Sequence, residues 1–548
     1  MASTRDGGMS EDIFDYIVVG GGSAGCVVAS RLCELPDVRV LLLEKGPSDW
    51  NPYIHMPAMF YKTGTGNLVE RYHYVDGAGT NNRNEALTMV QARVLGGGSS
   101  VNGMVYVRGT REDYDIWEAN GASGWGYDDI LPYYRKAEDN DQFHNNHHGV
   151  GGPLKVSQQR NLHPLSKQWL LAAQEAGIPY VPDFNTGAPA GCGPYQITAR
   201  GARRSSTAVS YLSRAKKTGQ LDVRTNCTVR RVVIAGNKAT GVEYERGGNV
   251  KTVRCRHEVV LSAGAITSPK LLMLSGIGSP GELASHGIEV VNGLAGVGKN
   301  LHDHVEVSLV YDLNNTNSFD RYKRLHWQIL AGLQYLLFQS GPITSNIIET
   351  GAFWYTKHGA STPDIQLFFL PGVGVEEGMG TTSTGCGCTS SISLARPKSR
   401  GYVGLRSADP KAPPIVDPNY LSNGNDLETI MDGMRIADNI MQQPSMKGQI
   451  ARRSHPKKEF ESEDEVKAFL YDQKRPGLHV CGTCRIGDDV LGVVDKDLQV
   501  RGISGLRVAD ASVIPSIVSA NTNAVSIMIG EKAADHIKAS HRGASIRT

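Results

Sequence analysis

Two short apolar runs near the N-terminus flank a longer segment in which apolar residues recur with helical spacing. Residues 14–19 form a β-branched and aromatic run bounded by glycines, which predicts a buried parallel strand. Residues 24–35 have helix-compatible spacing, and residues 38–43 are a second apolar run. Because parallel strands must be joined by a crossover, these segments predict a right-handed βαβ unit.

A similar strand-then-helix pattern returns near the C-terminus, over residues 502–537. The chain has 548 residues, far more than one typical domain, and the motifs described below are spread over its whole length. Those motifs must converge in space, which predicts an α/β fold with interleaved lobes. Two polar, glycine-rich stretches, residues 141–152 and 375–390, are predicted to be surface loops or lids.

A glycine-rich turn follows the first predicted strand. Gly20, Gly22 and Gly25 form GxGxxG there. Glycine permits close approach of the backbone, and the N-terminus of the next helix presents N–H groups to a pyrophosphate. The motif alone also fits an ordinary turn, but Glu44 follows it by about 20 residues, where a carboxylate can accept hydrogen bonds from ribose hydroxyls. The alternative for Glu44 is a solvent-facing carboxylate. A carboxylate there disfavours a 2′-phosphate, so FAD or NAD fits better than NADP.

Charge and cysteine content narrow the classes of partner. The 57 basic and 55 acidic residues give a formal charge of +2, which offers no electrostatic reason to expect nucleic acid or an anionic membrane as a partner. Nine cysteines over this length argue against a disulfide framework and indicate a reducing compartment, so we expect a cytoplasmic protein. The longest apolar stretch, residues 328–338, is broken by Gln and Gly, so no transmembrane segment is predicted. Peripheral membrane contact stays an open alternative.

Five ordered blocks resemble the glucose-methanol-choline (GMC) oxidoreductase family. Residues 92–106, ARVLGGGSSVNGMVY, resemble its first signature, and residues 264–278, GAITSPKLLMLSGIG, resemble its second. The βαβ unit and the C-terminal HVCGTCRIG and NTNAVSIMIGEKAAD blocks extend the resemblance over nearly the whole chain. It points to the choline dehydrogenase-like and alcohol dehydrogenase branch, and it implies FAD as the cofactor.

The resemblance also implies which residues surround the cofactor. Besides the glycines and Glu44, those residues are Ser23, Ala24, Arg93, Gly97, Ser100, Asn102, Gly103, Met104, Val105, Val229, Ala263, Gly264, Asp510, Ala511, Asn521 and Thr522. In choline oxidase-like members a histidine before the asparagine of the first signature bonds covalently to the flavin. Val101 occupies that place here and has no nucleophile, so noncovalent FAD is expected. The segment around residue 264 is predicted to end a strand and to begin a helix at Pro269.

Oxidation of an alcohol on a flavin requires removal of the hydroxyl proton while a hydride leaves for flavin N5. His479 resembles the family's catalytic histidine, and Asn521 resembles its hydrogen-bonding partner. A histidine base predicts that activity rises with deprotonation of one group near neutral pH. Glu306 lies where choline enzymes keep a glutamate near the substrate ammonium, and it is either a substrate-binding or a structural carboxylate.

Other residues of chemical interest have simpler interpretations. Cys481 and Cys484 form CxxC without a thioredoxin-like context, and we expect them to be packing residues. His144, His147 and His148 lie in an asparagine-rich loop, which we expect to be solvated, and no metal site is predicted.

The resemblance predicts oxidation of a small-molecule alcohol, taken to be primary, to the aldehyde, with O₂ or a quinone as electron acceptor. The sequence does not distinguish an oxidase from a dehydrogenase, and it does not give the oligomeric state. One alternative is a redox-neutral enzyme of the hydroxynitrile lyase type on the same scaffold. Others are a flavin-binding protein without catalysis and a flavoprotein that uses NAD(P)H, for which no second GxGxxG opens a βαβ unit.

The predicted domains alternate along the chain. A Rossmann-like FAD-binding domain is expected to comprise residues 12–154, 216–311 and 476–540, the last with the catalytic residues. An α+β substrate-binding domain is expected to comprise residues 155–215 and 312–475.

Overall fold

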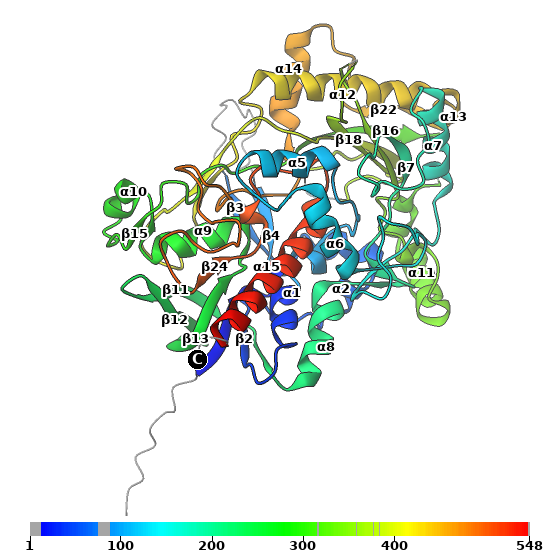
Figure 1. Cartoon of the computed structure of the whole chain (residues 1–548). Coiled ribbons are helices and arrows are strands. Elements are labelled where there is room, and N and C mark those ends of the chain that lie inside the picture. The colour runs from blue at the N-terminus through cyan, green and yellow to red at the C-terminus, as the bar shows by residue number, and fades with distance from the viewer. Residues whose placement is uncertain are drawn as a thin grey trace, which may run out of the picture.

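The computed structural model contains two large β-sheets with helices packed around them (Figure 1). It describes residues 13–74, 88–314, 317–357, 359–375, 378–382 and 384–545. Strands that are distant in sequence lie side by side in each sheet, so the α/β fold with interleaved segments is confirmed.

The N-terminal βαβ unit is present as the sequence predicts. Strand β1 (Ile13–Val19) pairs in parallel with β2 (Val40–Leu43), and helix α1 (Ser23–Leu32) connects them. Both strands are almost completely buried because sheet neighbours and helices cover them. The apolar residues at the ends of the predicted segments, Leu35 and Val38, are also buried, but they lie in the turn between helix and strand.

The first sheet draws strands from three widely separated parts of the chain. Its order is β10 (Leu221–Arg224), β2, β1, β13 (Asn249–Leu261), β12 (Lys238–Arg246) and β11 (Thr228–Ala235), and β24 (Leu506–Val508) also pairs with β13. The pairs β10–β2, β2–β1, β1–β13 and β13–β24 are parallel, whereas β11, β12 and β13 form an antiparallel meander. The long β13 pairs with β12 through its first half and with β24 through its last three residues.

Helix α15 (Thr522–Ser545) packs against α1 and so joins the two ends of the chain (Figure 1). Glu531 on α15 accepts hydrogen bonds from the Arg31 guanidinium at 2.7 and 2.8 Å and from the Tyr211 hydroxyl at 2.8 Å. The Glu531 side chain is fully buried, and charged hydrogen bonds of this kind are among the stronger ones in proteins. This contact holds the C-terminal helix against the last turn of α1.

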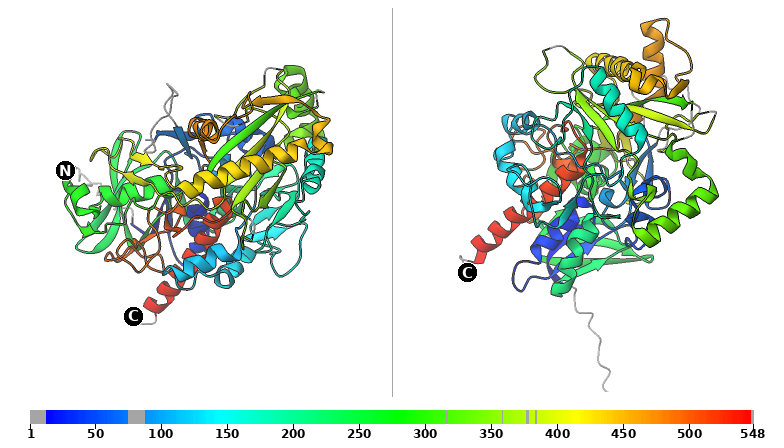
Figure 2. Two further views of the ribbon diagram at one scale, coloured as in Figure 1. Left: turned by 90° about the horizontal axis from the view of Figure 1, so that it is seen from above. Right: turned by 90° about the vertical axis from the view of Figure 1, so that its right-hand side faces the viewer.

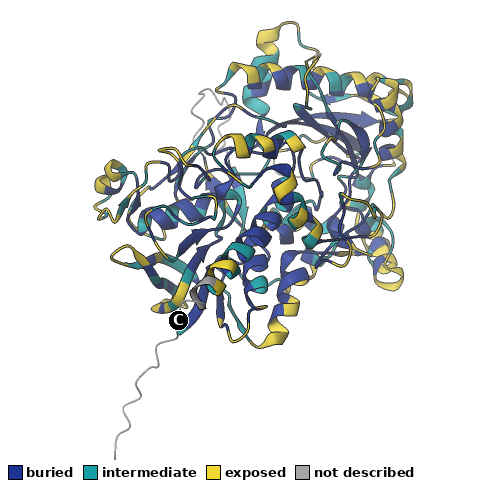
Figure 3. Cartoon of the chain, viewed as in Figure 1, coloured by how far each residue is buried: buried dark blue, intermediate teal, exposed yellow. Residues whose placement is uncertain are grey.

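The second sheet is antiparallel and comes from the later part of the chain. Its order is β17 (Thr350–Trp354), β18 (Ile365–Leu370), β19 (Gly387–Leu394), β16 (Val305–Leu313) and β22 (Ile450–His455), and β23 (Arg475–Pro476) also pairs with β16. Helices α7 (Pro164–Glu175) and α12 (Gly424–Gln442) pack on it, and α12 is the long yellow helix in Figure 2. Strands β16, β18 and β19 are the buried layer beneath these helices (Figure 3). The predicted domain boundaries stay a prediction, and one of them, at residue 311, falls within β16.

Two local predictions are wrong. Helix α9 (Gly264–Leu274) begins before Pro269, which therefore lies inside it. Proline has no N–H to donate to Ala265, and the Thr483 hydroxyl donates to that carbonyl instead, at 2.6 Å. Residues 387–390, predicted to be loop, are buried in β19. Within the described ranges, no helix combines the length and the apolar character that spanning a bilayer requires.

Candidate active site

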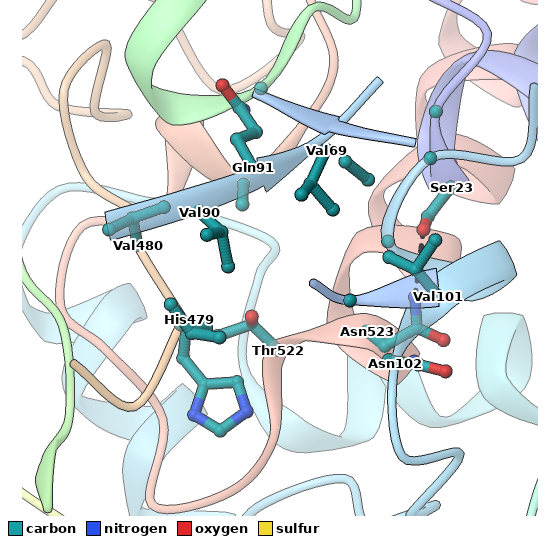
Figure 4. Close-up of a pocket in the computed structure, with 18 of the residues that line it drawn as sticks. Ser23, Val69, Val90, Gln91, Val101, Asn102, His479, Val480, Thr522 and Asn523 are labelled. Atoms are coloured by element: carbon teal, nitrogen blue, oxygen red, sulfur yellow. Dashed lines mark hydrogen bonds between the residues drawn. The ribbon is translucent and has the colours of Figure 1, made fainter. Parts of the chain in front are cut away.

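One cavity of about 530 Å³ has walls from both sheets. The ends of β1 and β2 contribute from the first sheet, and Glu306, Phe368 and Ser391 contribute from the second. A volume of this size is typical of small-molecule and cofactor sites. Figure 4 shows one part of it, in which Asn523 donates a hydrogen bond to the Ser23 hydroxyl at 2.8 Å.

The glycine-rich turn lies at one end of the cavity. Gly20 has φ +101°, and a Cβ there would lie 2.4 Å from the Ser262 carbonyl oxygen. A Cβ on Gly25 would lie 1.9 Å from the Gly20 oxygen, and one on Gly97 would lie 2.6 Å from the Gly22 Cα. Side chains are therefore excluded where these segments meet. The N-terminus of α1 has no side-chain cap at Gly22, so its backbone N–H groups are available to an anionic group.

Glu44 lies beside this turn and is buried rather than solvent-facing. Its carboxylate accepts hydrogen bonds from the backbone N–H groups of Gly21 at 2.8 Å and Gly46 at 2.7 Å. Burial raises the pKa of Glu44, and these two hydrogen bonds oppose that effect. Each carboxylate oxygen keeps a second lone pair, so the side chain can hold the turn and still accept from a ligand hydroxyl.

His479 and Asn521 meet at another part of the same cavity. The Asn521 Nδ2 lies 2.9 Å from the His479 Nε2, and the Asn521 Oδ1 accepts a hydrogen bond from Gln366 at 3.4 Å. Gln366 thereby orients the amide so that its NH₂ group faces the histidine. The two residues predicted to act together are thus in direct contact.

A second histidine fixes the tautomer of His479. The His304 Nε2 lies 3.0 Å from the Val518 carbonyl oxygen, which can only accept, so this nitrogen carries the proton. Burial lowers the pKa of His304 to about 4, so the ring is neutral and its Nδ1 is an acceptor. The Nδ1 atoms of His304 and His479 are 3.0 Å apart, so His479 donates through Nδ1. Its Nε2 therefore keeps a lone pair, directed at Asn521.

The pKa of His479 lies well below the ordinary value of 6.5 because the ring is buried and because His304 and the Arg475 guanidinium disfavour a second positive charge. His479 is therefore neutral at pH 7. The sequence led us to expect that His479 titrates near neutral pH, whereas its environment places the titration at more acidic pH. The backbone of this segment is also fixed, since Asp303 accepts from the His479 N–H at 2.6 Å and from the Tyr420 hydroxyl at 2.5 Å.

Glu306 lines the cavity, and it is paired with Arg475. Glu306 on β16 and Arg475 on β23 are direct neighbours across the two strands, and the guanidinium donates to the carboxylate at 2.5 Å. Both side chains are largely buried. The pair carries no net charge, which weakens any attraction of Glu306 for a cationic ligand.

Most residues predicted to surround the cofactor line the cavity, with two exceptions. Gly25 packs against the Gly20 carbonyl, and the Ser100 hydroxyl donates to the Leu95 carbonyl at 2.8 Å. Cavity residues that the sequence interpretation did not single out include Phe60, Gln91, Lys270, Ser391, Arg475 and Asn523. Lys270 and Asn523 lie within quoted motifs and could have been found there, whereas the others reach the cavity through pairing and packing over long distances.

The remaining candidates take no part in this cavity. Cys481 and Cys484 are buried, free thiols, and burial raises their pKa values well above the ordinary range. The expectation of a solvated histidine loop is wrong for His148, which is buried between Glu138 at 3.0 Å and Asp183 at 2.9 Å. These carboxylates raise its pKa despite the burial. Across the part of the chain that the structure describes, no group of three or more His, Cys, Asp or Glu residues could hold a metal ion.

Comparison with known proteins identifies the family. The GMC oxidoreductase models match residues 14–306 and 397–530. The chain is 39% identical to an alcohol dehydrogenase [acceptor] from Pseudomonas putida, with 96% of each chain covered. It is 40% identical to an oxygen-dependent choline dehydrogenase from Sinorhizobium medicae, with 95% of each covered. Pyridoxine 4-oxidase from Mesorbium loti has a similar structure, with a TM-score of 0.86, 28% identity and coverage of 96% of this chain and 99% of the other. The chain belongs to the GMC oxidoreductase family.

Proposed function

We propose that this protein is an FAD-dependent oxidoreductase that oxidises an alcohol to the aldehyde. The observation that carries the proposal is the continuity of the cavity, which joins a glycine-lined helix N-terminus and Glu44 to the lone pair of His479 Nε2. A cofactor with a pyrophosphate and a ribose fits the first end, and proton removal fits the second. The relatives named alcohol dehydrogenase and choline dehydrogenase support the same reaction class.

The cavity residues divide into groups according to the part of FAD that they would hold. The N–H groups at the start of α1 suit the pyrophosphate, Glu44 suits the adenosine ribose, and Val229 suits the adenine. The residues proposed for the remaining parts are Ser23, Ala24, Arg93, Gly97, Asn102, Gly103, Met104, Val105, Ala263, Gly264, Asp510, Ala511 and Thr522. Bound FAD supplies the acceptor for the hydride.

His479 and Asn521 carry out the protein's part of the reaction. The His479 Nε2 accepts the hydroxyl proton of the alcohol, because this nitrogen has its lone pair in the cavity and the ring is neutral at pH 7. The Asn521 NH₂ group, already directed at that nitrogen, donates to the substrate oxygen and holds it in place. His304 keeps the His479 proton on Nδ1, away from the substrate.

We infer a neutral primary alcohol as substrate in preference to a cationic one. Glu306, the wall carboxylate supplied by the second sheet, is neutralised by Arg475, and other parts of the wall are apolar, with Phe60, Ile348 and Phe368 among them. The curated relatives named choline dehydrogenase favour the cationic alternative.

The free thiols of all nine cysteines support a cytoplasmic location. The electron acceptor is proposed to be O₂ or a quinone.

Anaerobic stopped-flow reduction of the flavin with a panel of alcohols tests the proposal. Neutral primary alcohols should bleach the flavin, and His479→Ala should slow bleaching by about 10²–10⁴-fold with the flavin retained. Asn521→Ala should lose less, and His144→Ala in the exposed loop serves as the control. Absence of bleaching by any alcohol would favour a redox-neutral lyase, and unchanged bleaching in His479→Ala would exclude this base.

The same assay tests the substrate class and the acceptor. Choline should reduce the wild type more slowly than a neutral alcohol of similar size, and Arg475→Gln should narrow that difference because it releases the charge of Glu306. Arg475→Lys keeps the positive charge and is the matched control. Admission of air then separates the acceptors, because rapid recolouring indicates an oxidase and slow recolouring indicates another acceptor.

A further inference from the structure

Helix α11 (Leu325–Phe338) presents a broad apolar surface to solvent. Seven of its large apolar side chains are at least half exposed: Leu325, Ile329, Leu330, Leu333, Leu336, Leu337 and Phe338. Leu325, Ile329, Leu333 and Leu336 follow one another at intervals of three or four residues, so they form a stripe along one face. Single exposed hydrophobic residues are ordinary on protein surfaces, but a contiguous patch of this kind marks an interaction site.

The opposite face of α11 holds the helix to the rest of the protein. Ala331 and Tyr335 are buried in a small apolar cluster with Ala202 and Ile343, and the Tyr335 hydroxyl donates to the Ala202 carbonyl at 3.0 Å. The apolar stripe therefore cannot turn inward without breaking these contacts. In Figure 1, α11 lies at the edge of the molecule, and Figure 3 shows its outer side as exposed.

The charges around α11 are predominantly positive, although the net charge of the chain is close to zero. Arg321, Lys323 and Arg324 precede the helix, and no Asp or Glu occurs between residues 321 and 348. Lys323 is paired with Asp320 at 2.7 Å, so the two arginines supply the positive charge. The Arg321 guanidinium lies over the Trp327 ring, 3.9 Å from its centroid. An apolar stripe next to basic residues and a tryptophan is the pattern of helices that lie in the interface of an anionic membrane.

We propose that α11 is a docking surface for an anionic lipid bilayer. A helix of this length extends about 21 Å, shorter than the ~30 Å hydrocarbon core, so it lies along the membrane surface rather than across it. The apolar stripe enters the boundary between headgroups and acyl chains, and Arg321 and Arg324 contact lipid phosphates. Membrane docking does not depend on which alcohol the enzyme oxidises.

The position of α11 would bring the cavity close to the membrane. The role that we assign to this closeness rests on the proposed function. Met56 and Met59 pack against the α11 cluster, and the chain continues from them to Phe60, which lines the cavity. After α11 the chain continues to Ile348, which also lines the cavity. The segments that support α11 thus lead into the cavity wall, and a lipophilic alcohol or quinone dissolved in the membrane would lie close to it.

Vesicle flotation of the intact holoenzyme tests the proposal. The wild type should float with vesicles of phosphatidylcholine and phosphatidylserine, and less with phosphatidylcholine alone or at high salt. Leu333→Gln with Leu337→Gln should reduce the affinity by about tenfold or more. Arg324→Gln should reduce it about fivefold, only with anionic lipid. The matched control is Val290→Gln with Val291→Gln, two exposed residues next to β15 (Asn292–Gly293), on the side of the molecule away from α11 (Figure 1).

The outcomes are distinguishable from failure of the proposed function because flotation is measured without substrate. Retained flavin absorbance and an unchanged circular dichroism spectrum would show that the variants are folded. Failure of the wild type to float, or equal loss of flotation in the control, would overturn the proposal. A dimer in solution that Leu333→Gln with Leu337→Gln dissociates, without any vesicle binding, would also overturn it and assign α11 to a second copy of the chain.

Discussion

His479 is held by contacts that determine which of its nitrogens carries the proton. His304 is neutral, donates to Val518 and accepts from the His479 Nδ1, which leaves the His479 Nε2 as the basic atom. His304 does not line the cavity, so its proposed role is to position the base. The contact between the two rings joins residues 175 positions apart in the chain.

Replacing His304 should therefore impair the base without removing it. His304→Leu is expected to slow flavin reduction by about 10–100-fold, because the His479 ring loses the partner that fixes its tautomer. His304→Gln can still accept from His479 through its amide oxygen and should recover part of the rate. Stopped-flow reduction with matched flavin content measures both variants, and equal losses in the two would assign His304 a purely structural role.

The lowered pKa of His479 determines how the rate of flavin reduction should depend on pH. Burial, His304 and Arg475 disfavour the protonated ring, so His479 stays neutral as the pH falls through 6.5. The rate of flavin reduction should be constant near neutral pH and fall only at more acidic pH, where the ring finally gains a proton. A rate profile measured from pH 4 to 8 checks this, and a midpoint at or above 6.5 would contradict the assigned environment.

At this scale, the sequence identified the residue types of the pair His479 and Asn521 through their motif blocks. It could not reveal that Glu306 is neutralised, since Arg475 is 169 residues away in the chain and meets it only through the pairing of β16 and β23. The role of His304 was inaccessible for the same reason. Electrostatics at the site depends on contacts between distant segments, which a motif does not record.

The crossing of α1 and α15 depends on a residue without a side chain. A Cβ on Gly530 would lie 2.9 Å from both the Ala24 carbonyl oxygen and the Val27 Cβ. Gly332 lies in the exposed helix α11. Apart from its chain neighbours and the backbone of its own helix, a Cβ there would have no described atom within 4 Å. Replacement of glycine by alanine should therefore lower the free energy of unfolding at position 530 and raise it at position 332.

Gly530→Ala is expected to reduce the free energy of unfolding by about 1–3 kcal/mol, because the helices must separate to admit the methyl group. Gly332→Ala should increase it by up to about 1 kcal/mol, because alanine favours the helix and no contact is disturbed. Denaturant unfolding of the two holoproteins measures both changes. Equal destabilisation at the two positions would show that close packing of α1 against α15 does not explain the effect of Gly530→Ala.

Elements with a strong local pattern were predictable, and those set by distant partners were not. The run of apolar residues in β1 and β2 and the spacing of α1 predicted the βαβ unit with small errors at the helix ends. The start of α9 was predicted wrongly because a proline usually marks the first turn of a helix. Here the Thr483 hydroxyl replaces the missing N–H, and no local pattern around Pro269 indicates that partner.

The proposed cofactor site is assembled from the N-terminal, central and C-terminal parts of the chain. Val101 lines the cavity. The family resemblance puts it in the place of the histidine that bonds to the flavin in choline oxidase-like members, and valine has no nucleophile, so we propose that FAD is held noncovalently. Acid precipitation of the holoenzyme should therefore release all of the yellow colour into the supernatant. Colour that stays with the pellet, checked by mass spectrometry of the intact chain, would show a covalent bond elsewhere.

Strand β24 joins the first sheet beside β13, although it is separated from it by more than two hundred residues. During translation, the edge of β13 at Val259–Leu261 has to wait for residues 506–508 for a time on the order of 10–50 s. An open sheet edge is a site for wrong pairing, so the nascent chain needs protection over this interval. Because Asn521 and α15 are synthesised after β24, the cavity can bind its cofactor completely only once these later residues have also left the ribosome.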